Sequence, residues 1–265
     1  MNETGAGGGR GGGNKAWWDA LDTCLGFFTR LSLRPAGGLP LAQATVAFAP
    51  VGALIGLAVG LSFMLLTGLG LPALAAALAA VCIGVALTGA LHEDGLADCA
   101  DALGSRDGTE QRLAIMRDSR IGSFAGLALI FSVGLRAAAL ASLGGFAALA
   151  ACIAAHGLSR GYLPSVMAHQ QLARPDGLAA AAGTPSEADA RRALAIGLAV
   201  ALVPAILVSP IGSIVAMALA LAAMAGASAL ARRAFGGYTG DVLGAIQQCG
   251  EVAMLLGWAM MMGMQ

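Results

Sequence analysis

The chain has 265 residues, of which 58% are hydrophobic and only 11% are charged, and its formal net charge is zero. A soluble domain carries about a quarter charged residues, so this composition excludes an ordinary soluble protein and indicates a polytopic membrane protein. The neutral balance gives no hint of a nucleic-acid partner, and none is predicted. The five cysteines are scattered and include no C-x-x-C pair, so they predict neither a disulfide framework nor a zinc site.

The N-terminal region divides into a glycine-rich tail and an amphipathic segment. Residues 1–14 are of low complexity and are predicted to form a disordered tail, without the apolar core of a signal peptide. Residues 15–34 combine Trp17, Trp18 and other apolar side chains with acidic and basic ones. This mixture predicts a helix that lies in the membrane interface. Residues 15–265 are predicted to form a single membrane-embedded domain.

Seven apolar stretches follow, and most are close to the roughly 20 residues that a helix needs to cross the hydrocarbon core. They lie at 41–68, 71–91, 122–143, 145–163, 193–209, 211–231 and 242–263. The sequence therefore predicts an all-α membrane helix bundle of about seven transmembrane helices, within a range of about six to eight. Abundant Gly and Ala favour close approach of these helices.

Basic residues are distributed unevenly between the connections. The segments 1–40, 92–121, 160–192 and 232–241 hold every Lys and Arg except Arg136. Because Lys and Arg near the ends of spans favour the cytoplasmic side, these four segments are predicted to face the cytoplasm. Arg136 lies within an apolar stretch and is predicted either to snorkel to the outer surface or to pair inside the bundle.

An acidic run lies at the end of the second apolar stretch. Asp94, Asp98 and Asp101 are spaced i, i+4 and i+7, which places three carboxylates on one face of a helix. Such carboxylates repel one another, so the pattern predicts a bound cation. Mg²⁺ is favoured, with Mn²⁺ as the alternative, because magnesium takes one or two carboxylates together with water and phosphate oxygens. A solvated acidic helix end or a proton relay is the other interpretation of the same spacing.

Further segments on the same predicted side carry groups suited to phosphate. Arg117 and Arg120 follow the acids, and Ser159 and Arg160 end the fourth apolar stretch. Residues 236–241 form a glycine-rich turn into a helix N-terminus, a geometry that can receive phosphate. Simple anchoring by positive charge explains the arginines equally well. Together these segments predict a metal-dependent site for phosphate chemistry that faces the cytoplasm.

Three titratable residues inside or near the apolar stretches are less specific. Glu251 is predicted to face the bundle interior, either as a ligand or as a hydrogen-bonded structural acid. His156 is interpreted as a satisfied core residue. His92 adjoins the acidic run, and a functional and a structural role are both open.

Two strings of residues resemble the signature of the cobalamin synthase family, the adenosylcobinamide-GDP ribazoletransferases. They are 92–104 (HEDGLADCADALG) and 116–122 (MRDSRIG), and similar elements stand at 28–31, 50–56, 159–161 and 236–245. The resemblance extends over most of the chain. Glu93 stands where a hydrophobic residue is expected, so it is not carried over as a ligand.

The resemblance implies the last assembly step of the cobalamin nucleotide loop. The ribose 3′-hydroxyl of α-ribazole, or of its 5′-phosphate, attacks the cobinamide-linked phosphorus of adenosylcobinamide-GDP. GMP leaves, and adenosylcobalamin or its 5′-phosphate forms. The resemblance also implies a multi-pass enzyme of the bacterial cytoplasmic (inner) membrane, surrounded by the lipid bilayer, whose single catalytic domain is residues 15–265. Homo-oligomer formation is left open.

The resemblance also gives roles to individual residues. Asp94, Asp98 and Asp101 hold Mg²⁺ against the diphosphate, and Asp118 or one of these acids orients or deprotonates the attacking hydroxyl. Substrate binding is assigned to His92, Arg117, Ser119, Arg120, Ser159, Arg160, Thr239 and Asp241.

Two other functions are weighed against this one. A membrane phosphotransferase of the CDP-alcohol phosphatidyltransferase type also uses a D-G-x-x-A helix with several carboxylates. In this chain, however, Ala97 is followed by Asp98 and not by the Arg of that pattern, and the downstream G-x-x-x-D-x-x-x-D half is missing. A cation- or proton-coupled transporter needs acids near the middle of the membrane. Only Glu251 fits that requirement, because the other acids gather at one face.

Overall fold

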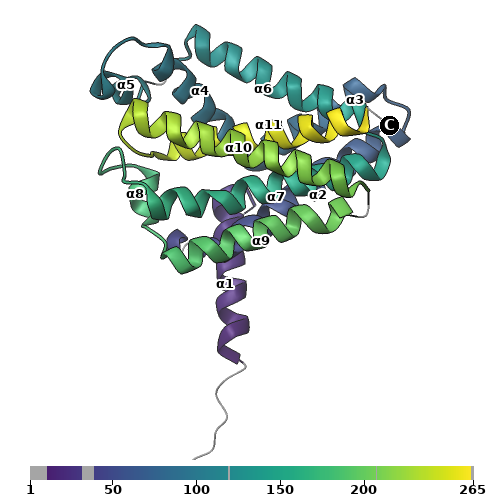
Figure 1. The fold of residues 1–265 in the computed structure, drawn as a ribbon, viewed down its shortest axis with the longest axis horizontal. Coiled ribbons are helices and arrows are strands. Elements are labelled where there is room, and N and C mark those ends of the chain that lie inside the picture. Colours follow the sequence, from purple (N-terminus) through teal and green to yellow (C-terminus); the bar gives the residue numbers. More distant parts are fainter. Residues whose placement is uncertain (1–10, 32–38, 119, 207, 264–265) are drawn as a thin grey trace, which may run out of the picture.

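The computed structural model describes residues 11–31, 39–118, 120–206 and 208–263, and this part of the chain is helical and contains no β-strand (Figure 1). The prediction of an all-α fold is therefore confirmed. The helices are α1 (Gly11–Phe28), α2 (Phe48–Gly68), α3 (Ala73–Thr88), α4 (Leu91–Gly104), α5 (Thr109–Ile115), α6 (Ser123–Ser142), α7 (Gly145–His169), α8 (Leu178–Ala182), α9 (Glu187–Ile206), α10 (Pro210–Phe235) and α11 (Gly240–Met262), with two 3₁₀ turns at Leu41–Gln43 and Thr45–Ala47.

Several of these helices are suited to cross a membrane. Among the described residues, three segments are long and apolar enough by length and composition: Thr45–Gly68, Ser123–Ser142 and Pro210–Phe235. Helices α3 and α4 form a pair bent by 94°, which makes a fourth span if the pair is counted as one. The chain is therefore a helical membrane protein, while the count of seven spans stays a prediction.

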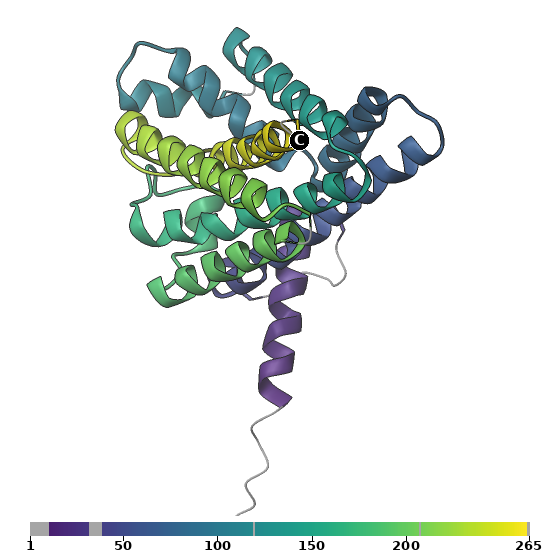
Figure 2. The same ribbon diagram turned by 45° about the vertical axis from the view of Figure 1, so that its right-hand side comes forward.

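Helix α7 forms the centre of the bundle, and glycine allows its neighbour α2 to approach closely. Figures 1 and 2 show α7 enclosed by the other long helices, in agreement with the burial of most of its residues. A Cβ atom on Gly56 of α2 would lie only 2.3 Å from the carbonyl oxygen of Cys152 on α7. A Cβ on Gly52 would lie 2.2 Å from the carbonyl oxygen of His156. The backbones of α2 and α7 therefore touch, as expected where lipid leaves helices no hydrophobic drive to associate.

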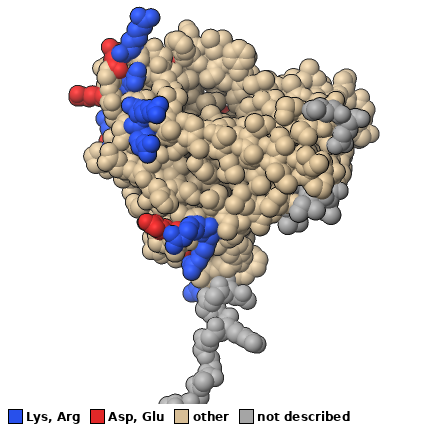
Figure 3. All heavy atoms as spheres, viewed as in Figure 1, with Lys and Arg blue, Asp and Glu red and all other residues tan. Residues whose placement is uncertain are grey.

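The connections rich in basic residues meet at one edge of the bundle. The α4–α5 region, the α7–α9 connection and the α10–α11 turn lie on the left in Figure 1, and the short uncharged connections lie opposite. Figure 3 shows Lys and Arg gathered on this left-hand side, while the broad remainder of the described face carries no charge. The predicted grouping of these segments is thus seen in space. Their cytoplasmic orientation stays a prediction.

The N-terminal helix projects away from the bundle (Figures 1 and 2). It begins at Gly11, ahead of the predicted start at residue 15, and ends at Phe28. Residues 1–10 of the predicted tail lie outside the described part of the chain. The last turn of α1 packs on the bundle, because Phe28 is buried against Phe48 with ring centroids 4.9 Å apart.

The contact between α2 and α7 yields a stability prediction. In Gly56→Ala the added methyl meets a backbone oxygen that cannot move without displacing α7, so we expect a loss of roughly 1–3 kcal/mol, typical of overpacking. Gly68→Ala on the same helix is the matched control, because no atom lies within 4 Å of the added Cβ there. Thermal unfolding in detergent would measure both variants. Equal melting temperatures would contradict the close approach.

Candidate active site

A sharp break separates the acidic helix α4 from α3. Gly89 and Ala90 both have left-handed backbone conformations, with φ of 65° and 60°. Such a conformation costs a non-glycine residue free energy and is rare, so Ala90 is held there by its surroundings. The chain consequently turns by 94°, and α4, which carries the acidic run, belongs to the segment 92–121 that is predicted to lie outside the membrane spans. The break therefore directs the carboxylates along the charged edge of the bundle.

Glycines let α4 cross the beginning of α11 at van der Waals distance. A Cβ on Gly95 would lie 2.6 Å from the carbonyl oxygen of Asp241, and one on Gly244 would lie 3.2 Å from the Cα of His92. The hydroxyl of Thr239 accepts a hydrogen bond from the Val242 amide at 3.2 Å and so caps α11. The crossing places Asp241, in the first turn of α11, beside the acidic face of α4.

Four carboxylates influence one another at this crossing. The pKa of Asp98 is raised from its ordinary value to about 7, chiefly by burial and then by the negative charges of Asp94, Asp241 and Asp101. Burial also raises the pKa of Asp241, against the opposing effect of Arg174, whose Nη2 lies 3.3 Å from its Oδ2. The cluster therefore has an excess of negative charge that a cation would relieve.

Asp101 is separated from the other acids by its hydrogen bonds. Its carboxylate accepts from the amide of Gly122 at 2.6 Å and from that of Ala125 at 2.9 Å, and it thereby caps the beginning of α6. Within the described part of the chain, no three His, Cys, Asp or Glu side chains are grouped to hold a metal ion. Asp94 and Asp98, one turn apart on α4, provide the two carboxylates that Mg²⁺ typically takes, so the donor set fits this ion. Metal binding itself stays a prediction.

A cavity of about 280 Å³ opens beside these acids. His92, Asp94, Arg174 and Asp241 form its charged and polar lining. Its apolar wall is formed by side chains from α1, α2, α4, α7, α8 and α11 and from the turn at Leu41–Gln43. The apolar lining consists of Phe27, Phe28, Leu41, Phe48, Leu91, Leu163, Met167, Leu178, Ala179, Ala182 and Leu243. A largely apolar cavity with a few convergent polar groups is the usual form of a small-molecule site.

The protonation of His92 is fixed by its neighbours. Its ring stacks on Phe28 with centroids 5.7 Å apart, and its Nδ1 lies 3.5 Å from Nη2 of Arg160. Because the guanidinium of Arg160 can only donate, Nδ1 must accept and Nε2 carries the proton. Burial, followed by the charge of Arg160, lowers the pKa of His92. His92 is therefore a neutral N–H donor in the wall of the cavity.

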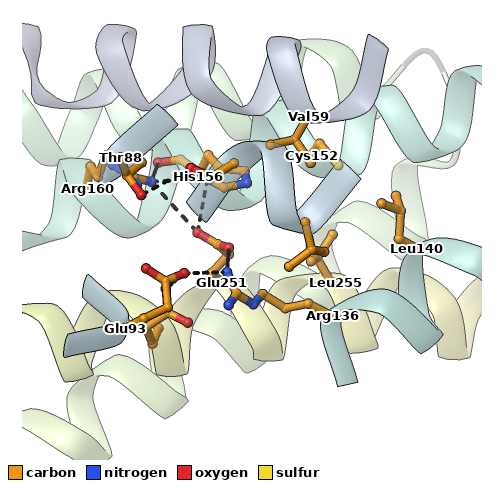
Figure 4. Close-up of a pocket in the computed structure, with 13 residues that line it drawn as sticks. Val59, Thr88, Glu93, Arg136, Leu140, Cys152, His156, Arg160, Glu251 and Leu255 are labelled. Carbon is orange, nitrogen blue, oxygen red and sulfur yellow. Dashed lines mark hydrogen bonds and ion pairs between the residues drawn. The ribbon is translucent and has the colours of Figure 1, made fainter. Parts of the chain in front are cut away.

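A cluster of charged side chains lies in the interior of the bundle, directly behind α4 (Figure 4). Glu251 is at its centre, with one oxygen 2.9 Å from Nη1 of Arg136 and the other 3.0 Å from Nδ1 of His156. The same Arg136 nitrogen lies 3.0 Å from Glu93, and Arg160 lies 3.8 Å from Glu251. Two arginines thus balance two glutamates. Of the two alternatives predicted for Arg136, pairing inside the bundle is the one observed.

Polar side chains of α11 complete this cluster. Gln247 donates from its amide to Ser159 at 3.0 Å and also to Glu251. Gln248 donates to Glu93 at 3.2 Å and accepts from Ser132 at 2.8 Å. These bonds remove most of the cost of burying polar groups in the bundle.

Ser159 and Arg160, which were predicted to contact substrate, belong to the buried cluster. Each is only 1% exposed, and neither lines the cavity. Arg160 reaches the cavity indirectly, because its guanidinium lies 3.5 Å from His92 and 5.8 Å from the centroid of the Phe28 ring. Both residues thus support the cavity wall, and direct contact with substrate stays a prediction.

The predicted arginines of the α5–α6 region lie in exposed segments. Arg117 pairs with Asp176 at 2.8 Å, and Arg120 donates from Nε to both oxygens of Asp118 at 3.0 Å. These hydrogen bonds from Arg120 lower the pKa of Asp118. A carboxyl with a lowered pKa is a weak base at neutral pH. Ser119 lies outside the described residues.

Apart from Ser159 and Arg160 in the buried cluster, most of the predicted site residues form two groups. His92, Asp94 and Asp241 line the cavity, Asp98 lies beside these acids, and Thr239 donates to Asp241 at 3.2 Å. The other group lies around an open hollow of about 510 Å³ that is lined by Asp101, Asp118 and Arg120 among others.

Sequence patterns did not identify Arg174 or Phe28 as part of the cavity. Arg174 follows α7 in a loop whose position depends on distant backbone hydrogen bonds. The Ala173 amide donates to the carbonyl of Tyr238 at 2.9 Å, and the Tyr238 amide donates to Gln171 at 3.0 Å. No local signal connects this loop to the glycine-rich turn before α11. The position of Glu93 was also missed, although an acid within an otherwise apolar motif is a usable signal.

The protein is helical and membrane-embedded, and its acid-lined cavity lies beside a buried ion cluster, an arrangement typical of a membrane-embedded enzyme. The sequence model of the cobalamin-5-phosphate synthase family matches residues 20–259. The chain is 44% identical to an adenosylcobinamide-GDP ribazoletransferase of Bradyrhizobium diazoefficiens over 85% of its own length and 86% of the relative's. It is 40% identical to an adenosylcobinamide-GDP ribazoletransferase of Allorhizobium ampelinum over 92% of its own length and 98% of that relative's. No solved structure matches. The chain therefore belongs to the cobalamin-5-phosphate synthase family and is a transferase of cobalamin biosynthesis.

The raised pKa of Asp98 predicts a pH-dependent stability. Between about pH 4 and pH 7 the folded protein binds a proton at Asp98 that the unfolded chain has lost, so stability should fall as pH rises through this interval. The Asp98→Asn variant should lose that part of the pH dependence. Melting temperatures in magnesium-free detergent at pH 5 and pH 7.5 would measure it. Added Mg²⁺ should raise the wild-type value at pH 7.5 and leave the variant nearly unchanged.

The buried cluster predicts a large cost for removing one partner. Arg136→Ala leaves Glu93 and Glu251 without their shared cation, and breaking a buried pair typically costs about 3–5 kcal/mol. Arg192→Ala is the control, because Arg192 pairs with Asp189 on the exposed surface, where a pair contributes about 1 kcal/mol or less. Unfolding in detergent would compare the two variants. A cost for Arg136→Ala as small as that of the control would show that the cluster does not stabilise the bundle.

Proposed function

We propose that this chain joins α-ribazole, or its 5′-phosphate, to adenosylcobinamide-GDP and releases GMP. The observation that carries this proposal is that Asp94, Asp241, Arg174 and His92 line one cavity, with Asp98 close enough to Asp94 and Asp241 for their charges to raise its pKa. Carboxylates that suit a divalent cation, an arginine and a neutral donor are the groups that phosphate transfer between two nucleotide-like substrates needs.

The reaction requires one bond to form and one to break at phosphorus. The ribose 3′-oxygen forms a bond to the phosphorus that carries cobinamide, and the bond from this phosphorus to the bridging oxygen breaks. GMP leaves with the bridging oxygen, and the hydroxyl proton passes to a base of the protein. The product is adenosylcobalamin, or its 5′-phosphate when the acceptor carries that group. Such a step depends on positioning and charge neutralisation more than on covalent chemistry by the protein.

Asp94 and Asp98 would hold Mg²⁺, since they lie one turn apart on the face of α4 that meets α11. Bound magnesium supplies charge neutralisation of the diphosphate oxygens and so favours departure of GMP. Arg174 is positioned to contact phosphate at the same cavity, because its guanidinium already lies 3.3 Å from Asp241. Arg117 and Arg120, on the exposed segments nearby, are suited to the GMP part.

Asp241 is the favoured base for the attacking hydroxyl. It lines the cavity, and burial raises its pKa toward the range in which a carboxylate accepts a proton effectively. Asp118 is disfavoured for this role, because hydrogen bonds from Arg120 lower its pKa. The Nε2–H of His92 would donate a hydrogen bond to the acceptor substrate and would not remove a proton.

The cavity is lined by residues of the α7–α9 connection and the beginning of α11, which lie at the edge of the bundle where basic residues gather (Figure 3). The site is therefore proposed to open to the cytoplasm of the bacterial inner membrane. A transporter is disfavoured by the state of Glu251. Its two oxygens are held by Arg136 and His156, so Glu251 is not an unpaired acid of the kind that carries an ion across a membrane.

The proposal predicts the effect of removing the two α4 carboxylates. Asp94→Asn and Asp98→Asn should each lower turnover by about a hundredfold or more, because a lost charge contact in the transition state costs that much. GMP release from adenosylcobinamide-GDP by washed membranes, with and without Mg²⁺, would measure it. Asp189→Asn, on the exposed first turn of α9, should keep wild-type activity. A double variant at Asp94 and Asp98 that is present in the membrane and active would refute the assignment.

A further inference from the structure

We propose that the cavity beside Asp94 and Asp241 binds the flat aromatic base of the acceptor nucleoside, and that the corrinoid substrate stays outside it. This inference rests on the proposed function, and it specifies which of the two substrates enters the bundle.

The size of the cavity excludes the corrin ring. Its volume of about 280 Å³ lies just below the range of roughly 300–1,000 Å³ that sites for drug-sized ligands occupy. A bicyclic base with part of its ribose is a ligand of this size. A corrin ring with its amide side chains is several times larger than such a base, so it has to remain at the rim, where the diphosphate can still reach the acids.

The apolar wall suits a flat ring. Phe28 and Phe48 pack edge to face with centroids 4.9 Å apart, and Leu163 and Met167 of α7 line the cavity with them. Aromatic rings and a methionine are favourable neighbours for the face and edge of an apolar heterocycle. No charged side chain belongs to this wall, so a base without charge can be buried there at little cost.

The polar groups of the same cavity are suited to the ribose. His92, Asp94 and Asp241 line the cavity, and the guanidinium of Arg174 lies 3.3 Å from Asp241. The His92 ring stacks on Phe28 with centroids 5.7 Å apart, so these polar groups begin next to the phenylalanines. The sugar attached to a base that packs on the phenylalanines would have its hydroxyls near the proposed base Asp241. A lipid acyl chain would fill the apolar wall but would leave the polar groups without partners, which is unfavourable for buried polar groups.

The short helix α8 provides a way to fill the cavity selectively. Ala182 lines it and is buried, whereas Ala181, the preceding residue of the same helix, is exposed and does not line it. In Ala182→Phe the new ring occupies the proposed base site. We expect the KM for α-ribazole to rise about tenfold or more and the KM for adenosylcobinamide-GDP to change less than about twofold. The control Ala181→Phe should leave both values at those of the wild type.

A second variant and a binding measurement make the test independent of turnover. Ala179→Leu fills the same wall with a smaller side chain and should raise the KM for α-ribazole in the same direction, so it serves if Ala182→Phe fails to fold. Calorimetry with α-ribazole alone and detergent-solubilised protein should show binding that Ala182→Phe weakens about tenfold and Ala181→Phe preserves.

The outcomes separate this inference from the proposed function. A wild-type protein that releases no GMP from adenosylcobinamide-GDP and α-ribazole would refute the proposed function. An active wild type in which Ala182→Phe raises the KM for adenosylcobinamide-GDP instead would refute only the assignment of the cavity. The same conclusion would follow if both cavity variants matched the wild type in both KM values and in the calorimetry.

Discussion

The close crossing of α4 over the N-terminus of α11 is the contact on which the site depends. Gly95 and Gly244 allow it, since a methyl group at Gly95 would collide with the backbone of Asp241. The crossing brings an acid of α11 beside two acids of α4 that are far away in the sequence. Without it, Asp94 and Asp98 would be a solvated acidic stripe. With it, they become one side of a charge cluster that favours a cation.

Adjacent residues of helix α4 face two different chemical environments. Glu93 points into the bundle and pairs with Arg136, while Asp94 lines the cavity. The inner cluster is electrically balanced and mostly hydrogen-bonded, as charges inside a membrane protein have to be. The outer acids are unbalanced, as a metal and phosphate site requires. The paired inner acid therefore fixes the rotation of the helix that presents the unpaired outer ones.

The buried ion cluster and the cavity are connected by few side chains. Arg160 belongs to the inner cluster, and it also lies against His92 and the face of Phe28 in the cavity wall. Its charge, with burial, keeps His92 neutral and fixes which ring nitrogen carries the proton. In this way a buried arginine that does not itself line the cavity determines which hydrogen bond His92 can offer to a substrate.

Composition and sequence pattern were sufficient to determine the class of fold, the grouping of basic segments and the placement of the acidic run on one helix. These follow from the sequence because hydrophobic length, the period of a helix and the preference of arginine for one side are local properties. The sequence did not determine that Asp101 caps α6, that Arg136 pairs with Glu93 and Glu251, or that Arg174 joins Asp241. Each of these contacts joins helices distant in the chain, and their approach depends on glycines whose neighbours only the packed bundle defines.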